Sequence, residues 1–421
     1  MGWFQLLALL IVLAALNSYI NFRYVRLPAT IGVMLIALAV SLALIGLSKL
    51  GLLDAHRRLA HAVERIDFDA LLLHGMLAFL LFAGALHVDL SDLARDWVMI
   101  SLLAVAGTLV STFIVGGATF FMVRGLGFEL PMMWCLLFGA IISPTDPIAV
   151  LGIMRNVGAP KPLETQLAGE SLFNDGIGVV IFIVLLEIAQ RPASVTVAGI
   201  SLLLIKEAVG GVALGLVGGV LAYRMLKRVD HYQVEVLITL ALSMGVYALA
   251  DSVHVSAPIA VVVAGLLIGN QGRAFAMSRK TEAHLDSFWE LIDAIMNAVL
   301  FLLIGLAVTV IEFTGHYFLV ALLAIAVTLL ARLASVAGVV SLIHLGRRPT
   351  MRGTIPVLAW GGLRGGISVA MALSLPASNH REMIVVITYV VVVFSIFVQG
   401  LTIGPVIRRV TQIRPVVEPR A

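Results

Sequence analysis

Cysteine and charge are both scarce in this chain, and each scarcity excludes a class of protein. Cys135 is the only cysteine among 421 residues, which rules out an intramolecular disulfide and argues against a cysteine-based metal site. Only 12% of the residues are charged and 61% are hydrophobic, whereas soluble domains carry about 25% charged residues. Together with a mean hydropathy of +1.07, this composition predicts an all-helical protein that crosses the lipid bilayer many times.

The sequence signatures of nucleotide-driven proteins and metalloproteases are also missing. The chain has no P-loop, no HExxH motif and no dinucleotide-binding fingerprint, so nothing in it indicates ATP coupling. Its net charge of +4 and pI near 9.4 fit cytoplasmic loops rich in Lys and Arg. We therefore expect no cofactor and no nucleic-acid partner.

The apolar runs of the chain supply about thirteen candidate spans, since a membrane-spanning helix needs roughly 20 apolar residues. They cover residues 3–20, 27–47, 69–88, 97–123, 130–154, 163–189, 203–226, 234–250, 255–270, 284–310, 317–346, 350–375 and 381–407. When the loops between them are assigned to alternate sides, Lys and Arg divide 18 to 7. The positive-inside rule then places the C-terminus in the cytoplasm and the N-terminus outside.

Polar residues interrupt the sixth candidate span, in the stretch GESLFNDG at 169–176. On a helix, Glu170 and Asn174 share one face, and Ser171 and Asp175 share the adjacent one. A charge at the bilayer centre costs about 3 kcal/mol on insertion scales, so ionisable residues there mark an ion or proton pathway by default. We expect the four side chains to line one cavity.

Two other candidate spans contain breaks. In the fifth span, Pro144 and Pro147 remove backbone donors and flank Thr145 and Asp146, which predicts an unwound link between two half-helices. In the twelfth, the stretch GGLRGGIS at 361–368 surrounds Arg364 with four glycines and predicts a second break. The alternatives are a simple proline kink and glycines that only allow close helix packing.

Two interrupted spans at corresponding places in two halves are typical of an inverted-repeat transporter. In such an arrangement, Asp146 can balance the electropositive helix N-termini at the breaks, and Arg364 can balance the electronegative C-termini. The breaks therefore predict both a repeat architecture and the place of these two charges.

The remaining buried charges fall into one pair and one unpaired acid. Glu170 and Arg332 form the expected ion pair, with another intramembrane acid as the alternative partner of Arg332. Asp175 then has no basic partner. Asn174 can orient it or form hydrogen bonds across the break, and the hydroxyls of Thr145 and Ser171 add neutral oxygens. One carboxylate with several neutral oxygens suits a hard monovalent cation.

Asp293 and Asn297 lie one turn apart in the tenth span. Two interpretations remain open for this pair. The two residues can line an access funnel, or they can lie at a solvated helix end.

At this point the motifs resemble those of a known family. SPTDPIAV (143–150), GESLFNDG (169–176), ARL (331–333) and GGLRGGIS (361–368) resemble the monovalent cation/proton antiporters, above all the electroneutral NhaP-type branch related to the animal Na⁺/H⁺ exchangers. The resemblance spans nearly the whole chain and implies a single antiporter domain, 1–421, of about thirteen helices with two crossed discontinuous helices, the NhaA-like antiporter fold.

The resemblance also implies how the helices divide and assemble. Ion-transporting core helices are expected at 97–189 and 317–407, and dimerisation or scaffold helices at 3–88 and 203–310. The implied assembly is a homodimer in the plasma membrane (the inner membrane of a bacterium) that works by elevator-type alternating access.

Residue by residue, the resemblance implies that Asp175 binds either the cation or the proton. Thr145 and Ser171 are then further Na⁺ ligands, Asp146 lies beside the site, Asn174 marks the branch, and Glu170 pairs with Arg332. Some relatives carry an additional acid in the third span, but here the stretch LFAGA at 81–85 has none. That extra ligand is absent or replaced by water.

We therefore expect electroneutral exchange of Na⁺, with Li⁺ as a second candidate ion, for H⁺. A K⁺/H⁺ antiporter of the same fold is the main alternative, because the sequence does not fix ion selectivity. An intramembrane hydrolase using Asp146 and Asp175 is a weaker one, since the expected Gly-x-Gly-Asp arrangement is missing. A passive cation channel is a third, and it would conduct current.

Overall fold

The computed structural model describes residues 3–50, 69–190, 197–311, 317–346 and 351–411, and within these ranges the chain is helical. In chain order the helices are α1 (Trp3–Ile20), α2 (Ala29–Lys49), α4 (Leu77–Leu86), α5 (Leu90–Arg95), α6 (Trp97–Ser101), α7 (Thr108–Gly125), α8 (Met132–Ile142), α9 (Ile148–Val157), α10 (Lys161–Gln190), α11 (Val197–Leu226), α12 (Tyr232–Ser252), α13 (Ala257–Leu267), α14 (Arg273–Ala276), α15 (Arg279–Ala307), α16 (Phe318–Leu345), α17 (Thr354–Gly361), α18 (Gly366–Leu373), α19 (Arg381–Phe394) and α20 (Gly400–Thr411). Short π-helical segments extend several of them: Asn21–Val25, Asp69–Met76, Leu102–Gly107, Ile268–Gly272 and Ser395–Gln399.

Each of the thirteen predicted spans corresponds to a helical region. Ten helices in the described ranges are long and apolar enough to cross a membrane without interruption. The other three regions are shorter, namely Ala70–Leu86 and the two interrupted spans formed by α8 with α9 and by α17 with α18. The count therefore agrees with the prediction, and two of the three short regions are the spans predicted to be broken.

The two breaks meet each other. Helix α8 ends at Ile142 and α9 begins at Ile148, while α17 ends at Gly361 and α18 begins at Gly366. Between them the amide of Asp146 donates a 2.8 Å hydrogen bond to the carbonyl of Leu363, as an isolated antiparallel bridge. Non-helical backbone at membrane depth needs partners from the protein, and the crossing supplies them.

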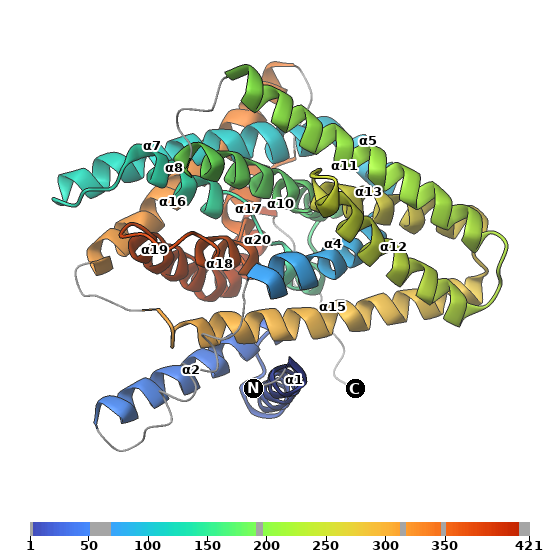
Figure 1. The fold of residues 1–421 in the computed structure, drawn as a ribbon, viewed down its shortest axis with the longest axis horizontal. Coiled ribbons are helices and arrows are strands. Elements are labelled where there is room, and N and C mark those ends of the chain that lie inside the picture. Colours follow the sequence, from blue (N-terminus) through green and yellow to red (C-terminus); the bar gives the residue numbers. More distant parts are fainter. Residues whose placement is uncertain (1–2, 51–68, 191–196, 312–316, 347–350, 412–421) are drawn as a thin grey trace.

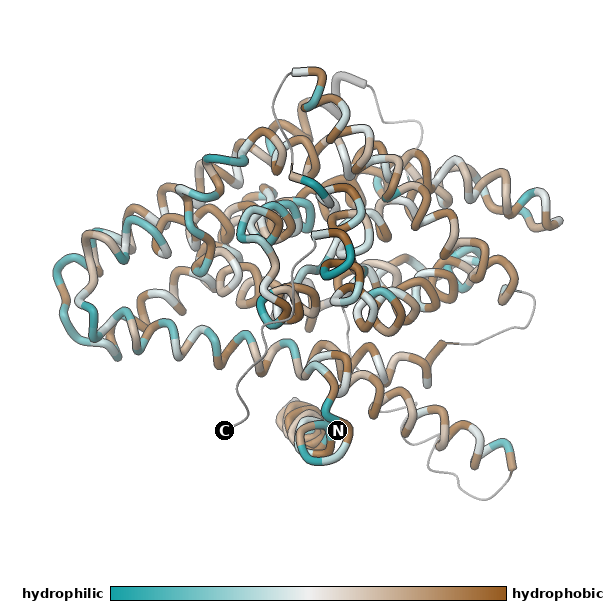
Figure 2. The backbone as a smooth tube through the Cα atoms, turned by 180° about the vertical axis from the view of Figure 1, so that it is seen from behind, coloured by the Kyte–Doolittle hydropathy of each residue, from teal (hydrophilic) through white to brown (hydrophobic). Residues whose placement is uncertain are grey.

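The helices gather around α15, which runs along the molecule (Figure 1). Helices α7, α8, α16 and α19 lie toward one end of it, and α11, α12 and α13 toward the other, with α1 and α2 beyond α15 (Figure 1). The buried apolar side chains form two clusters, and α15 contributes its first half to one and its second half to the other. Hydrophobic residues dominate the helices, with hydrophilic ones at helix ends and near the middle of the molecule (Figure 2).

Candidate ion-binding site

Asp175 lies in the middle of the unbroken helix α10 and borders a cavity of about 360 Å³. Its side chain is buried, with 8% of its surface exposed. Within the described ranges it forms neither a hydrogen bond nor an ion pair with another side chain. A buried carboxyl group that touches a cavity and has no cationic partner is available to an incoming ion.

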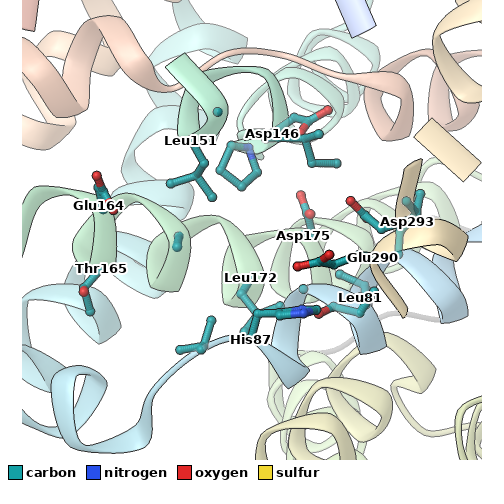
Figure 3. A pocket seen from close by; sticks show the side chains of 18 of the residues that line it. Leu81, His87, Asp146, Leu151, Glu164, Thr165, Leu172, Asp175, Glu290 and Asp293 are labelled. Carbon is teal, nitrogen blue, oxygen red and sulfur yellow. Dashed lines mark hydrogen bonds between the residues drawn. The ribbon is translucent and has the colours of Figure 1, made fainter. Parts of the chain in front are cut away.

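The cavity connects Asp175 to the ends of several helices. Its wall is formed by residues of α4, α5, α9, α10, α15 and α18, and Figure 3 shows side chains of many of the residues that line it. The polar and charged lining residues are His87, Asp89, Asp92, Asp146, Arg155, Lys161, Glu164, Thr165, Asp175, Glu290 and Asp293. Arg155 lies near the end of α9 and Lys161 begins α10, so the cavity runs from Asp175 toward those helix ends.

Asn174, Thr145 and Ser171 form one buried hydrogen-bonded cluster next to Asp175. The amide nitrogen of Asn174 donates to the Thr145 hydroxyl at 2.8 Å, and its oxygen accepts from the Thr145 backbone amide at 3.3 Å. The hydroxyls of Thr145 and Ser171 are 3.0 Å apart. These three described side chains do not line the cavity, so in this conformation they tie α10 to the break between α8 and α9.

Asp146 borders the cavity from within the break. One carboxylate oxygen accepts a 2.9 Å hydrogen bond from the amide of Ile148 at the start of α9. The carboxylate also lies against Gly365, where an added Cβ would be 2.1 Å from Asp146 Oδ2. Gly365 precedes α18, so one carboxylate faces the N-termini of two half-helices, which are electropositive. This is the placement that the sequence predicts.

Arg364 occupies the other break and faces the opposite helix ends. Its Nη1 donates to the carbonyls of Ser143 at 2.5 Å and Pro144 at 2.9 Å, just after α8. Its backbone amide donates to the Ser395 hydroxyl at 3.0 Å. A guanidinium at a helix C-terminus balances the partial negative charge of the free carbonyls there. The predicted position of Arg364 is therefore also present.

The ion pair predicted between Glu170 and Arg332 is present and buried. Arg332 contacts both carboxylate oxygens, through Nη1 to Oε1 and through Nη2 to Oε2 at 2.8 Å. Nη2 also donates to the carbonyl of Leu358 in the last turns of α17, at 2.9 Å. At Gly362, an added Cβ would lie 2.7 Å from Arg332 Nε, so a larger residue there would displace this guanidinium. Glu170 is fully buried and does not line the cavity.

The third predicted span forms an apolar part of the cavity wall, and acidic residues reach the cavity from α15 instead. Leu81 and Gly84 of α4 line the cavity without a carboxylate. Asp293 of α15 lines it, which favours the access-funnel interpretation of that residue, whereas Asn297 is buried behind it. The sequence reading missed Glu290, which also lines the cavity. Its spacing of three residues from Asp293 puts both on one helix face and could have revealed it.

The comparisons with known proteins agree with this geometry. A profile of the family described as "Sodium/hydrogen exchanger, transmembrane" matches residues 8–409. The chain belongs to this family. It is 49% identical over 409 residues to the Na⁺/H⁺ antiporter NhaP of Pseudomonas aeruginosa, with 96% of each chain covered. It is 34% identical over 397 residues to the Na⁺/H⁺ antiporter NhaH of Halobacillus dabanensis, covering 93% of this chain and 94% of the relative.

A solved structure supports the same fold. The sodium proton antiporter MjNhaP1 from Methanocaldococcus jannaschii matches with a TM-score of 0.76 and 20% identity, over 97% of this chain and 98% of that one. The chain is therefore an all-helical, multi-span membrane transporter of NhaP type and not an enzyme. The family resemblance and the fold class inferred from its motifs are confirmed.

Proposed function

We propose that this protein exchanges Na⁺, and Li⁺ as a second ion, for H⁺ across the plasma membrane, with Asp175 binding either the cation or the proton. The observation that carries the proposal is the state of Asp175, a buried carboxyl group that borders a cavity and has no ionic partner among the described residues. Asp146 lines the same cavity, Ser171 lies one helix turn before Asp175 on α10, and the Thr145 hydroxyl contacts that of Ser171. Both hydroxyl oxygens become further Na⁺ ligands once the site closes around the ion.

Coupled exchange follows from the free-energy cost of moving an ionised, unpaired carboxylate through the membrane interior. Burial favours the neutral form of a carboxyl group, so Asp175 takes up a proton where Na⁺ is scarce and gives it up where Na⁺ displaces it. The site crosses the membrane only when Asp175 is neutralised by one ion or the other, because an unpaired charge in apolar surroundings is costly. One proton for one Na⁺ moves no net charge, so the exchange is electroneutral.

The moving unit in this proposal is the core, formed by residues 97–189 and 317–407. The contacts that balance its buried charges support the division, because Glu170–Arg332, Arg364–Ser143 and Asp146–Leu363 all lie inside these two ranges. The core can therefore move without breaking them. The scaffold comprises residues 3–88 and 203–310, and we expect it to form the interface of a homodimer. The cavity lies between the two units, with α9 and α10 on one side and α4 and α15 on the other.

The direction of the cavity follows from the proposed topology, with the N-terminus outside and the C-terminus in the cytoplasm. Arg155 and Lys161 lie on the side richer in Lys and Arg, which is cytoplasmic by the positive-inside rule. They line the same cavity as Asp175. The conformation is then the one in which the site is open to the cytoplasm.

Purified protein in proteoliposomes tests the proposal. A pH-sensitive dye inside the vesicles should report proton movement when Na⁺ or Li⁺ is added, and the rate should not change when the membrane voltage is clamped with a K⁺ ionophore. Proton movement with K⁺ in preference to Na⁺ would favour the K⁺/H⁺ alternative. A rate that follows the voltage, or a steady ionic current, would contradict electroneutral exchange.

A further inference from the structure

We propose that Asp293 is a third carboxylate of the transport pathway, one that raises the affinity of the site for cations only while the site faces the cytoplasm. The inference rests on the proposed function. It assigns a role to a residue of α15, outside the core helices that carry Asp146 and Asp175.

Asp293 faces the site across the cavity. Asp175 and Asp293 line the same cavity from α10 and α15, and Figure 3 draws the carboxyl groups of Asp175, Glu290 and Asp293 around one part of it. Asp146 lines the same cavity from the break between α8 and α9. An ion that approaches Asp175 through the cavity therefore passes between carboxylates on both walls.

The surroundings of Asp293 leave it free to attract a cation. In the described ranges, neither Lys nor Arg forms an ion pair with it. The basic side chains that line the same cavity are His87, Arg155 and Lys161. Asn297 lies one turn along α15 from Asp293. The side chain of Asn297 is only 3% exposed, and its Oδ1 has no hydrogen-bond partner among the described residues. A buried neutral oxygen without a hydrogen-bond partner thus lies one helix turn from the half-buried carboxylate.

The two sides of the cavity, α10 with Asp175 and α15 with Asp293, move differently during transport. Asp175 travels with the core in the proposed mechanism, whereas Asp293 stays with the scaffold. A fixed negative charge raises the local concentration of cations in a cavity with low-dielectric walls, and the effect fades with distance and with salt. Asp293 therefore acts on the site when it opens to the cytoplasm and loses its influence when the core carries Asp175 away. Helix α4, which has no acid on the cavity wall, cannot supply this charge.

Membrane vesicles of the two orientations test this assignment. In inside-out vesicles added Na⁺ reaches the cytoplasmic face, and in right-side-out vesicles it reaches the outer face. D293N should raise the Na⁺ concentration for half-maximal exchange about threefold to tenfold at the cytoplasmic face. The outer face should be unchanged, and D293E, which keeps the charge, should restore the wild-type value. E282Q removes a charge from the first turn of the same helix, away from the cavity, and serves as the matched control.

The outcomes separate the inference from the function on which it rests. Equal shifts at both faces, a shift confined to the outer face, or no shift in D293N would overturn the role of Asp293. If D293N fails to accumulate in the membrane, the wild type can be tested with added choline chloride, which screens charges without supplying a transported ion. The salt should weaken the affinity for Na⁺ more at the cytoplasmic face than at the outer face. Equal salt effects at the two faces would overturn the proposal. Absence of Na⁺-dependent proton movement in the wild type would instead contradict the proposed function.

Discussion

Asp146 and Arg364 each lie in the break of one interrupted helix and balance the ends of the other. The Asp146 carboxylate, between α8 and α9, lies against Gly365 at the start of α18. The Arg364 guanidinium, between α17 and α18, donates to the carbonyls of Ser143 and Pro144 at the end of α8. The two side chains thus contact three of the four helix ends at the breaks, namely the starts of α9 and α18 and the end of α8.

The close approach at Gly365 gives the first prediction. An added Cβ would be 2.1 Å from the Asp146 carboxylate, so G365A must displace that group from the N-terminus of α18. We expect exchange to slow by about tenfold to hundredfold, because displacements near 1 Å can cost that much. Dye-monitored proton flux in proteoliposomes measures it. Gly117 of α7 has open space around it, so G117A is the matched control and should transport normally. Normal transport by G365A would show that Asp146 need not lie at this helix end.

The buried ion pair gives the second prediction. R332A leaves Glu170 buried and charged without its partner, a change that costs about 3–5 kcal/mol. We expect a clearly lower melting temperature and a lower yield of folded protein. The double variant R332A/E170Q removes both charges and should recover part of the loss.

One result would contradict a structural role for the Glu170–Arg332 pair. A stable R332A protein that differs from the wild type only in its affinity for Na⁺ would mean that the pair belongs to the binding site. Thermal unfolding in detergent, measured alongside the half-saturating Na⁺ concentration, separates the two roles.

The contact between Asn174 and Thr145 gives the third prediction. Asn174 forms two hydrogen bonds to Thr145, across the break, so N174A and T145V should each destabilise the protein by about 1–3 kcal/mol. Because both variants remove the bond from the Asn174 amide nitrogen to the Thr145 hydroxyl, the double variant should lose less than the sum of the two. A thermal-unfolding double-mutant cycle measures the coupling. Strict additivity would indicate that the two side chains act independently.

Competition between the two ions gives the fourth prediction. If Na⁺ and H⁺ share Asp175, bound Na⁺ should raise the melting temperature of the wild type at high pH, since a ligand of the folded state stabilises it. Lowering the pH fills the site with protons, so the same Na⁺ concentration should stabilise less. The D175N protein should show no Na⁺-dependent stabilisation at any pH. A Na⁺ effect of constant size across the pH range would contradict competition.

The sequence predicts the local features of the site because local chemistry determines them. Pro144 and Pro147 lack the backbone donors that a continuous helix needs, and the glycines around Arg364 indicate the second break. Both interruptions can therefore be predicted from the sequence. The pair between Glu170 and Arg332 is also predictable, because an unpaired charge inside an apolar span is costly and an opposite charge in another span lowers that cost.

Other features depend on packing between distant segments and cannot be read from a local pattern. The bridge from Asp146 to Leu363 joins residues that are far apart in the chain. The sequence does not reveal that Thr145 and Ser171 contact each other and not the cavity in this conformation. It leaves two interpretations of Asp293 open, and only the packing of α15 against the cavity favours one of them.

The central claim is that a single carboxyl group, Asp175, carries both ions in turn. The measurement that tests it most directly is Na⁺-driven proton flux in proteoliposomes containing D175N, with folding verified by size-exclusion chromatography. The account predicts a folded protein with no flux for Na⁺, Li⁺ or K⁺, because a neutral amide can neither exchange a proton nor balance a cation. Flux comparable to that of the wild type from folded D175N would contradict it.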